Sequence, residues 1–82
     1  MSNIEIVSPL PGTFYTQPSP DAPPYVTAGQ RISAGQVVGL VEVMKQFSEI
    51  TADVAGIVVR VEVASGEPVE PGQTLVVLQP AG

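Results

Sequence analysis

The chain has 82 residues, a length that allows a single small domain (residues 1–82) with a thin hydrophobic core. It contains no histidine and no cysteine, which removes the commonest general base, the thiolate nucleophile and the usual transition-metal ligands. The net charge of −5 disfavours binding to nucleic acid. No apolar run reaches the roughly 18 residues of a membrane span, and the N-terminus lacks a signal-peptide pattern. We therefore expect a cytoplasmic protein that binds neither nucleic acid nor membrane.

Short runs rich in Val and Ile, separated at close intervals by Gly and Pro, predict an all-β chain. None of the longer apolar runs has the periodicity of a helix. In chain order, we expect strands near residues 3–8, 12–16, 24–27, 30–33, 36–43, 46–52, 56–63, 67–70 and 73–79.

The sequence also repeats itself. Residues 26–41 resemble residues 63–78 at an offset of 37, and residues 6–12 resemble residues 50–56 at an offset of 44. The first copy is therefore seven residues longer, and its extra residues fall within residues 17–25. Since neither copy could bury an apolar face alone, the two copies are expected to pack together as a pseudo-twofold sandwich or flattened barrel.

Lys45 is the only lysine of the chain, and it lies where the two copies join. The strands predicted on either side leave only Met44 and Lys45 for a hairpin turn. Two-residue turns of this kind favour Asn or Gly because their residues adopt positive φ, so a Met-Lys turn carries a backbone cost that often marks a functional site. The alternatives are a longer, unstrained loop, or a lysine that serves only to keep the tip soluble.

Several blocks of the sequence, in order and over residues 6–78, resemble the biotinyl domain of the biotin carboxyl carrier proteins of acetyl-CoA carboxylase. The blocks are Ser8-Pro9, Gly12-Thr13-Phe14-Tyr15, Pro18-Ser19-Pro20-Asp21-Ala22, Gly29-Gln30, Val41-Glu42, Met44-Lys45 and Gly66-Glu67-Pro68-Val69. The resemblance implies two four-stranded antiparallel sheets related by a pseudo-twofold axis, with the modified lysine on a hairpin tip. It also implies that the extra segment, residues 17–25, is the family's "thumb", which can lie against the biotin ring.

By the same resemblance, Lys45 carries covalently bound biotin that a biotin protein ligase attaches, and Met44, Val43, Glu42 and Gln46 flank the site. The implied function is a non-catalytic carrier subunit that shuttles a carboxyl group between a biotin carboxylase subunit and a carboxyltransferase subunit. No catalytic residue and no metal ligand is assigned to this chain. The lysine ammonium has no neighbouring base to deprotonate it, so the ligase is expected to supply the activation.

Three features depart from the family pattern. The usual Glu-Ala-Met-Lys-Met motif reads Glu42-Val43-Met44-Lys45-Gln46, which bears on recognition by the ligase. In the thumb, Gln17 stands where threonine is typical, and Pro23-Pro24 replaces a less rigid pair. The long Pro- and Ala-rich linker of many relatives is absent, so we expect a separate subunit.

Two alternatives to a biotin carrier remain. A lipoyl carrier would share the architecture, but lipoyl domains usually show Asp-Lys-Ala at the tip, so Met44 and the thumb-like insertion favour biotin. An unmodified biotinyl-like interaction module is the other alternative, because Val43 and Gln46 alter the usual motif. A stand-alone enzyme is disfavoured, since without His or Cys it would need a pair of carboxylates, and the acidic residues of this chain are scattered along the sequence.

Overall fold

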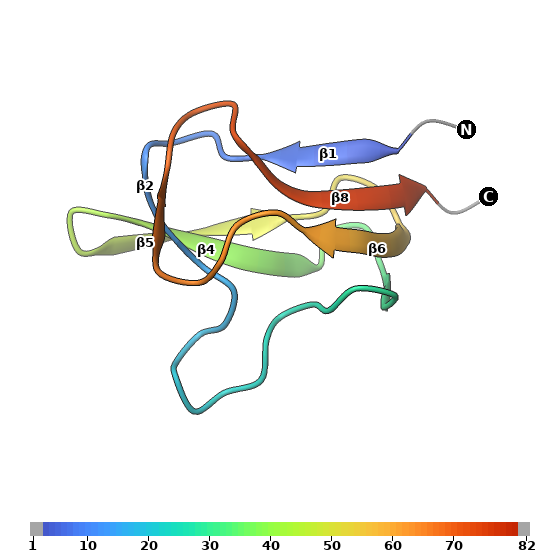
Figure 1. The fold of residues 1–82 in the computed structure, drawn as a ribbon, viewed down its shortest axis with the longest axis horizontal. Helices are drawn as coiled ribbons and strands as arrows, with labels where there is room; N and C mark the ends of the chain where they lie inside the picture. Colours follow the sequence, from blue (N-terminus) through green and yellow to red (C-terminus); the bar gives the residue numbers. More distant parts are fainter. Residues whose placement is uncertain (1–2, 81–82) are drawn as a thin grey trace.

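The computed structural model describes residues 3–80, and every regular element in that range is a β-strand (Figure 1). The strands are β1 (Ile4–Val7), β2 (Gly12–Tyr15), β3 (Arg31–Ile32), β4 (Val37–Val43), β5 (Gln46–Thr51), β6 (Gly56–Val61), β7 (Glu67–Val69) and β8 (Thr74–Pro80). Within the described range, no helix is present that could span a membrane.

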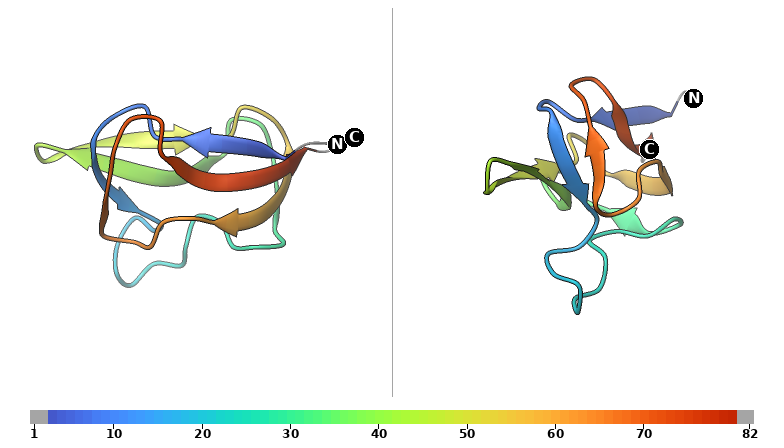
Figure 2. Two further views of the ribbon diagram at one scale, coloured as in Figure 1. Left: turned by 45° about the horizontal axis from the view of Figure 1, so that its top comes forward. Right: turned by 60° about the vertical axis from the view of Figure 1, so that its left-hand side comes forward.

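The eight strands form two four-stranded antiparallel sheets that pack as a sandwich, as expected (Figure 2). The terminal sheet has the strand order β1-β8-β6-β3, and the hairpin sheet has the order β5-β4-β2-β7. Along the chain, successive strands of each half alternate between the two sheets, so each half supplies two strands to each sheet. This interleaving explains why neither half of the sequence can form a closed core by itself.

The core between the sheets is built from the inward-facing residues of the strands. Phe14, Leu75 and Leu78 are fully buried, and burial of one such side chain contributes about 1.5–3 kcal/mol relative to leaving it exposed. Gly39 allows the Phe14 ring to enter this core, because a Cβ atom at Gly39 would overlap the ring. The central strand β4, which leads to Lys45, is thus fixed on its inner face.

The predicted repeat is confirmed in the turns. Gly29 and Gly66 have φ values of 88° and 89°, and Gly35 and Gly72 have values of 86° and 83°, so each pair separated by 37 residues adopts one conformation. Such positive φ values suit glycine, which has no Cβ. The offset of 44 appears in the hydrogen bonds: the Gly35 N–H donates to the Ala52 carbonyl and the Gly72 N–H to the Ser8 carbonyl, both at 2.8 Å, and Ser8 and Ala52 are 44 residues apart.

The strand expected at residues 24–27 is wrong. Pro23 and Pro24 have no N–H group to donate to a ladder, and this part of the chain is irregular. The Tyr25 N–H donates to the Thr16 carbonyl at 2.8 Å, and Val26 is buried in the core, so the two ends of the extra segment are held together. Between them, residues 17–24 project from the sandwich as the loop at the bottom of Figure 1.

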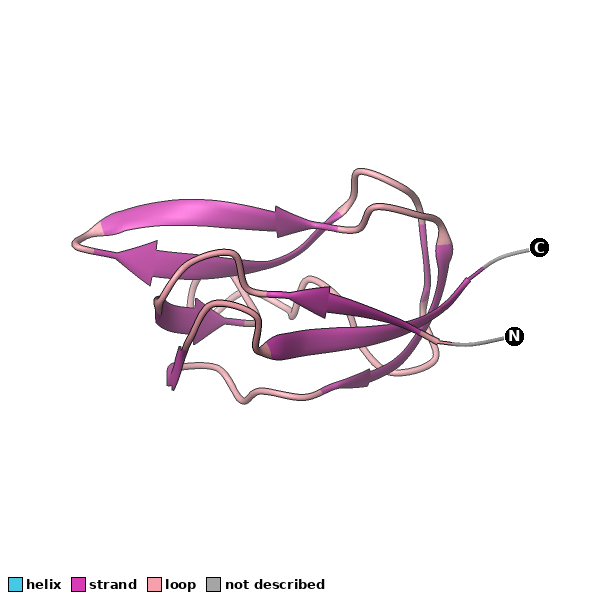
Figure 3. Cartoon of the chain, turned by 90° about the horizontal axis from the view of Figure 1, so that it is seen from above, coloured by secondary structure: helices cyan, strands magenta, loops and turns pink. Residues whose placement is uncertain are grey.

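The β4–β5 hairpin projects at one end of the molecule, and β1 starts and β8 ends at the opposite end (Figure 3). The pseudo-symmetry explains this arrangement, because the hairpin joins the two copies while Ile4 and Pro80 lie at the outer ends of the same two copies. The tip is therefore remote from the start of β1 and the end of β8.

Candidate functional site

Lys45 lies at the tip of the β4–β5 hairpin. Val43 pairs with Gln46, so the loop between the strands consists of Met44 and Lys45 alone. Their φ values are 51° and 68°, which makes the connection a type I′ turn. The predicted two-residue turn is therefore confirmed, and the alternative of a longer, unstrained loop is wrong.

This turn holds two ordinary side chains in the left-handed region, at a cost of about 1 kcal/mol per residue. The cost is not offset by burial, because Met44 is 91% exposed and Lys45 is also exposed. Lys45 makes no ion pair within residues 3–80, where Arg60 and Glu62 form the single salt bridge. The result is an amine presented to solvent at the end of the molecule, on a turn whose geometry the ladder of β4 and β5 imposes.

The other predicted site residues face different directions. Val43 is partly buried and packs against the core, while Gln46 is exposed beside the turn. Glu42 lies on the outer face of the hairpin sheet, where it pairs with Thr13 of β2 and Phe47 of β5. Only Met44 and Gln46 therefore flank the amine directly.

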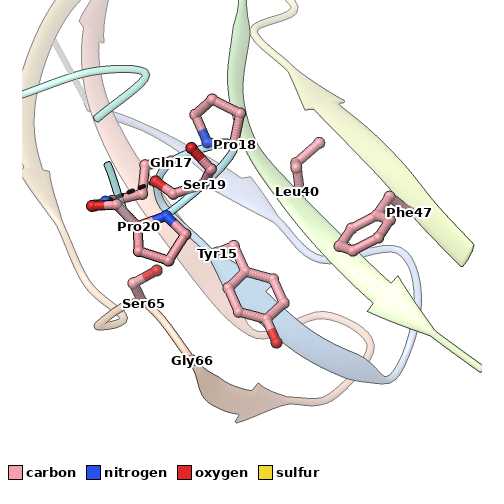
Figure 4. A pocket seen from close by; sticks show the side chains of 9 residues that line it. All are labelled: Tyr15, Gln17, Pro18, Ser19, Pro20, Leu40, Phe47, Ser65 and Gly66. Carbon is pink, nitrogen blue, oxygen red and sulfur yellow. Dashed lines mark hydrogen bonds between the residues drawn. The ribbon is translucent and has the colours of Figure 1, made fainter. Parts of the chain in front are cut away.

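The outer face of the hairpin sheet carries a hollow that the sequence reasoning missed (Figure 4). It has a volume of about 400 Å³. Its lining combines apolar side chains of the sheet with the thumb and one loop residue pair: Tyr15, Leu40 and Phe47, then Gln17, Pro18, Ser19 and Pro20, then Ser65 and Gly66. Strand alternation points to it only once the burial of Phe14 is known, since Tyr15 follows Phe14 and must then point outward.

Tyr15 and Phe47 form the aromatic part of this hollow. Their ring centroids are 6.2 Å apart with the planes inclined at 52°, a tilted arrangement that aromatic pairs favour. The Tyr15 hydroxyl donates a hydrogen bond to Glu42 Oε1 at 3.2 Å. This bond to Glu42, the negative charge of the same carboxylate and partial burial together raise the pKa of Tyr15 above its ordinary value of 10.0.

The thumb is braced by its own side chains and by a neighbouring loop. Gln17 Nε2 donates to the carbonyl oxygens of Ser19 at 3.0 Å and Pro20 at 3.1 Å. The Thr16 N–H donates to Ser65 Oγ of the β6–β7 loop at 3.1 Å. A threonine at position 17 would have a single hydroxyl donor on a shorter side chain, so the family's usual residue could not make both bonds of Gln17.

The site presents an exposed amine on a two-residue turn. The two neighbours of Lys45 in the sequence are Met44 and Gln46, and neither side chain is a base. Among residues 3–80, no three acidic side chains come close enough to hold a metal ion. The geometry therefore suits an attachment point that other proteins modify and use.

Comparison with curated proteins finds relatives over nearly the whole chain. The biotin carboxyl carrier protein of acetyl-CoA carboxylase from Nostoc is 46% identical over 76 residues, which are 93% of this chain and 42% of that protein. The protein of the same description from Chlamydia muridarum is 47% identical over 70 residues, which are 85% of this chain and 43% of that protein. The chain thus spans less than half the length of these relatives.

Comparison with solved structures supports the same fold. A single-chain, multi-domain long-chain acyl-CoA carboxylase superposes with a TM-score of 0.81 at 25% identity, over 96% of this chain and 7% of that one. The family model described as "Biotin-requiring enzyme" matches residues 4–78. The resemblance seen in the sequence is confirmed, and the chain belongs to the biotin/lipoyl family of biotin-requiring enzymes.

Proposed function

We propose that this chain is a biotin carboxyl carrier domain, which bears biotin on Lys45 and carries a carboxyl group between two active sites of a biotin-dependent carboxylase. One observation carries the proposal: the only lysine of the sequence is exposed on a positive-φ, two-residue turn at one end of the sandwich. The names of the Nostoc and Chlamydia relatives support it.

The residues at the tip fit covalent attachment of biotin. An amide bond to Nζ requires an amine that a ligase active site can surround, and Lys45 is exposed between an exposed Met44 and an exposed Gln46. Because the chain has one lysine, amide formation on a side chain is restricted to one position. Neither neighbour is a base, so the ligase must both activate the biotin carboxyl group and remove the proton from the ammonium.

The role of the chain in this proposal is to position the biotin that Lys45 carries. When bound, biotin supplies a ring nitrogen that accepts a carboxyl group at one site and gives it up at another. The type I′ turn holds the Lys45 backbone in one conformation, and the flexible side chain beyond it keeps its cargo at an effective concentration of roughly millimolar near a docked partner. Amide formation removes one positive charge, so the net charge changes from −5 to −6.

The partners in this proposal are a biotin carboxylase subunit, a carboxyltransferase subunit and a biotin protein ligase. The description of the relatives as parts of acetyl-CoA carboxylase makes acetyl-CoA the proposed acceptor. The carrier itself has no catalytic residue in this scheme.

Intact-mass measurement tests the proposal directly. The chain is incubated with a biotin protein ligase, biotin and ATP, and in parallel with a lipoyl ligase and lipoate. The expected result is a gain of one biotinyl group and no lipoyl group, with no gain in Lys45→Arg. Streptavidin binding by Lys45→Arg, lipoylation of the wild-type chain in place of biotinylation, or a chain left unmodified by both ligases would overturn the proposal.

A further inference from the structure

The internal repeat allows two faces of the same molecule to be compared. On the outer face of the hairpin sheet, four positions are Tyr15, Leu40, Glu42 and Phe47. By the two offsets of the repeat, their counterparts are Val59, Val77, Gln79 and Asn3; Asn3 directly precedes β1, and a register shift in β6 places Arg60 opposite Val77. The terminal sheet forms without an aromatic ring or a carboxylate at these positions. The two rings and the carboxylate on the hairpin sheet are therefore not required by the fold.

Phe47 is the most prominent of these side chains, since it is 59% exposed. Glu42 lies directly opposite Phe47 in the β4–β5 ladder, where Cβ atoms are roughly 5 Å apart. Glu49 follows Phe47 by two residues on the same face of β5, roughly 7 Å along the strand. An exposed aromatic ring thus has a carboxylate on each of two sides.

Tyr15 completes the arrangement. Its ring packs against Phe47 with centroids 6.2 Å apart, and its hydroxyl donates to Glu42 Oε1, which leaves the other carboxylate oxygen available. The Glu42 carboxylate is therefore oriented beside the rings before any ligand arrives.

The charges of the chain are also unevenly divided. Arg31 lies on β3 and Arg60 on β6, so both arginines belong to the terminal sheet. The strands of the hairpin sheet carry Glu42, Glu49 and Glu67 without an arginine, and Lys45 at the hairpin tip loses its charge when it is acylated. A partner for this face is expected to be basic.

We propose that the outer face of the hairpin sheet around Phe47 docks a partner protein through an arginine side chain, whose guanidinium stacks on Phe47 and pairs with Glu42 and Glu49. A guanidinium combines the two properties that this face requires, because it is planar and stacks on aromatic rings, and it donates to carboxylates in a fixed fork. A lysine ammonium is a compact, strongly hydrated charge and cannot stack in this way. The docking surface does not depend on what Lys45 carries.

A peptide titration of the full chain tests this surface. The probe is acetyl-Gly-Arg-Gly-amide, followed by NMR at low ionic strength, where exposed charges are least screened. The expected result is that signals of Tyr15, Glu42, Phe47 and Glu49 shift, and that the matching citrulline peptide, which has the same shape without the charge, shifts none of them. The lysine peptide is expected to bind roughly threefold more weakly.

Glu5 provides a matched control for Glu49. The two are equivalent in the repeat, they lie on the edge strands of the two sheets, and their removal changes the net charge by the same amount. Glu49→Gln is expected to weaken arginine-peptide binding roughly threefold, and Glu5→Gln to leave it unchanged. Equal effects of the two variants would overturn the proposal, because binding would then depend on net charge alone.

Two further measurements complete the test. Phe47→Leu keeps an exposed apolar residue but removes the ring, and it is expected to lose the preference for arginine over lysine while circular dichroism shows a folded chain; Phe47→Met serves the same purpose should Phe47→Leu unfold. In biotin-loaded protein, the arginine-dependent shifts are expected to persist. Their loss on loading would assign this face to the chain's own biotinyl arm and overturn the docking proposal, without affecting the proposed attachment at Lys45.

Discussion

The Tyr15 hydroxyl donates a hydrogen bond to Glu42 Oε1 at 3.2 Å, and this bond joins the base of the thumb to the hairpin that ends in Lys45. Tyr15 is the last residue of β2, two residues before the start of the extra segment at Gln17, and Glu42 lies three residues before the lysine. The bond crosses between adjacent strands of one sheet, so it holds the two functional appendages of the sandwich in a fixed relation.

This bond predicts a measurable titration. In a Tyr25→Phe background, where Tyr15 is the only tyrosine, the phenolate absorbance is expected to appear with a midpoint above pH 10, because the bond to Glu42 and its charge raise the pKa of Tyr15. Adding Glu42→Gln is expected to lower that midpoint. A midpoint that does not move on this second substitution would contradict the assigned cause.

The raised pKa also determines the direction of a stability change. The protonated tyrosine is favoured in the folded state, so its contribution is fully present below pH 10, the ordinary value, and is lost as the pH rises through the raised value. Tyr15→Phe should therefore unfold with a weaker dependence on pH above pH 10 than the wild-type chain, in urea titrations at a series of pH values. Between pH 7 and pH 9, where the contribution of Tyr15 is constant, the free energies of unfolding of the two chains should depend on pH to the same extent.

Asparagine at position 44 is expected to stabilise the fold. Met44 adopts φ 51°, a conformation that asparagine tolerates better than an unbranched apolar residue, and Met44 is 91% exposed, so little packing is lost. Met44→Asn should raise the free energy of unfolding by about 0.5 kcal/mol in urea titration. Met44→Leu is the control, with no gain expected, and Met44→Val should destabilise because a β-branched residue is strained at positive φ.

The sequence was informative where local patterns decide the structure. The alternation of Val and Ile with Gly and Pro predicted all eight observed strands, and the repeat predicted both the glycine turns and the extra segment. The expected strand at residues 24–27 failed because Val26 is apolar for a different reason, as an anchor of the thumb in the core. A short apolar run cannot distinguish these two roles, since both bury the same side chain.

The hollow could not be predicted for a related reason. Phe14 and Tyr15 are adjacent aromatic residues, and only the register of β2 against β4 and β7 determines which of them enters the core. Phe47 contacts Tyr15 because β2 and β5 both pair with β4. This pairing is long-range, so neither the sequence of β2 nor that of β5 predicts it alone. Lys45 was found because it depends on a two-residue turn, which is a local feature.

Alanine at position 39 is expected to be among the most damaging small changes in the chain. A Cβ at Gly39 would overlap the Phe14 ring, so Gly39→Ala should lower the free energy of unfolding by about 1–3 kcal/mol. Gly35→Ala is the contrasting case, since its Cβ meets no atom within 4 Å and the loss of about 1 kcal/mol comes from φ alone. A double-mutant cycle with Phe14→Leu should show coupling at position 39 and none at position 35.

Threonine at position 17, the residue typical of the family, is expected to loosen the thumb. Gln17 Nε2 donates to the carbonyl oxygens of Ser19 and Pro20, and a threonine hydroxyl cannot replace both bonds. The Ala22 N–H donates to the Ser19 carbonyl at 3.1 Å within the thumb. Hydrogen exchange of the Ala22 amide should therefore become faster in Gln17→Thr, while the thermal midpoint changes little because the thumb residues lie outside the core. Gln79→Thr, on the exposed part of β8, is the control and should leave thumb exchange unchanged. If exchange in the thumb is the same in Gln17→Thr as in the wild-type chain, the thumb is held by its ends at Thr16 and Tyr25 and not by the Gln17 amide.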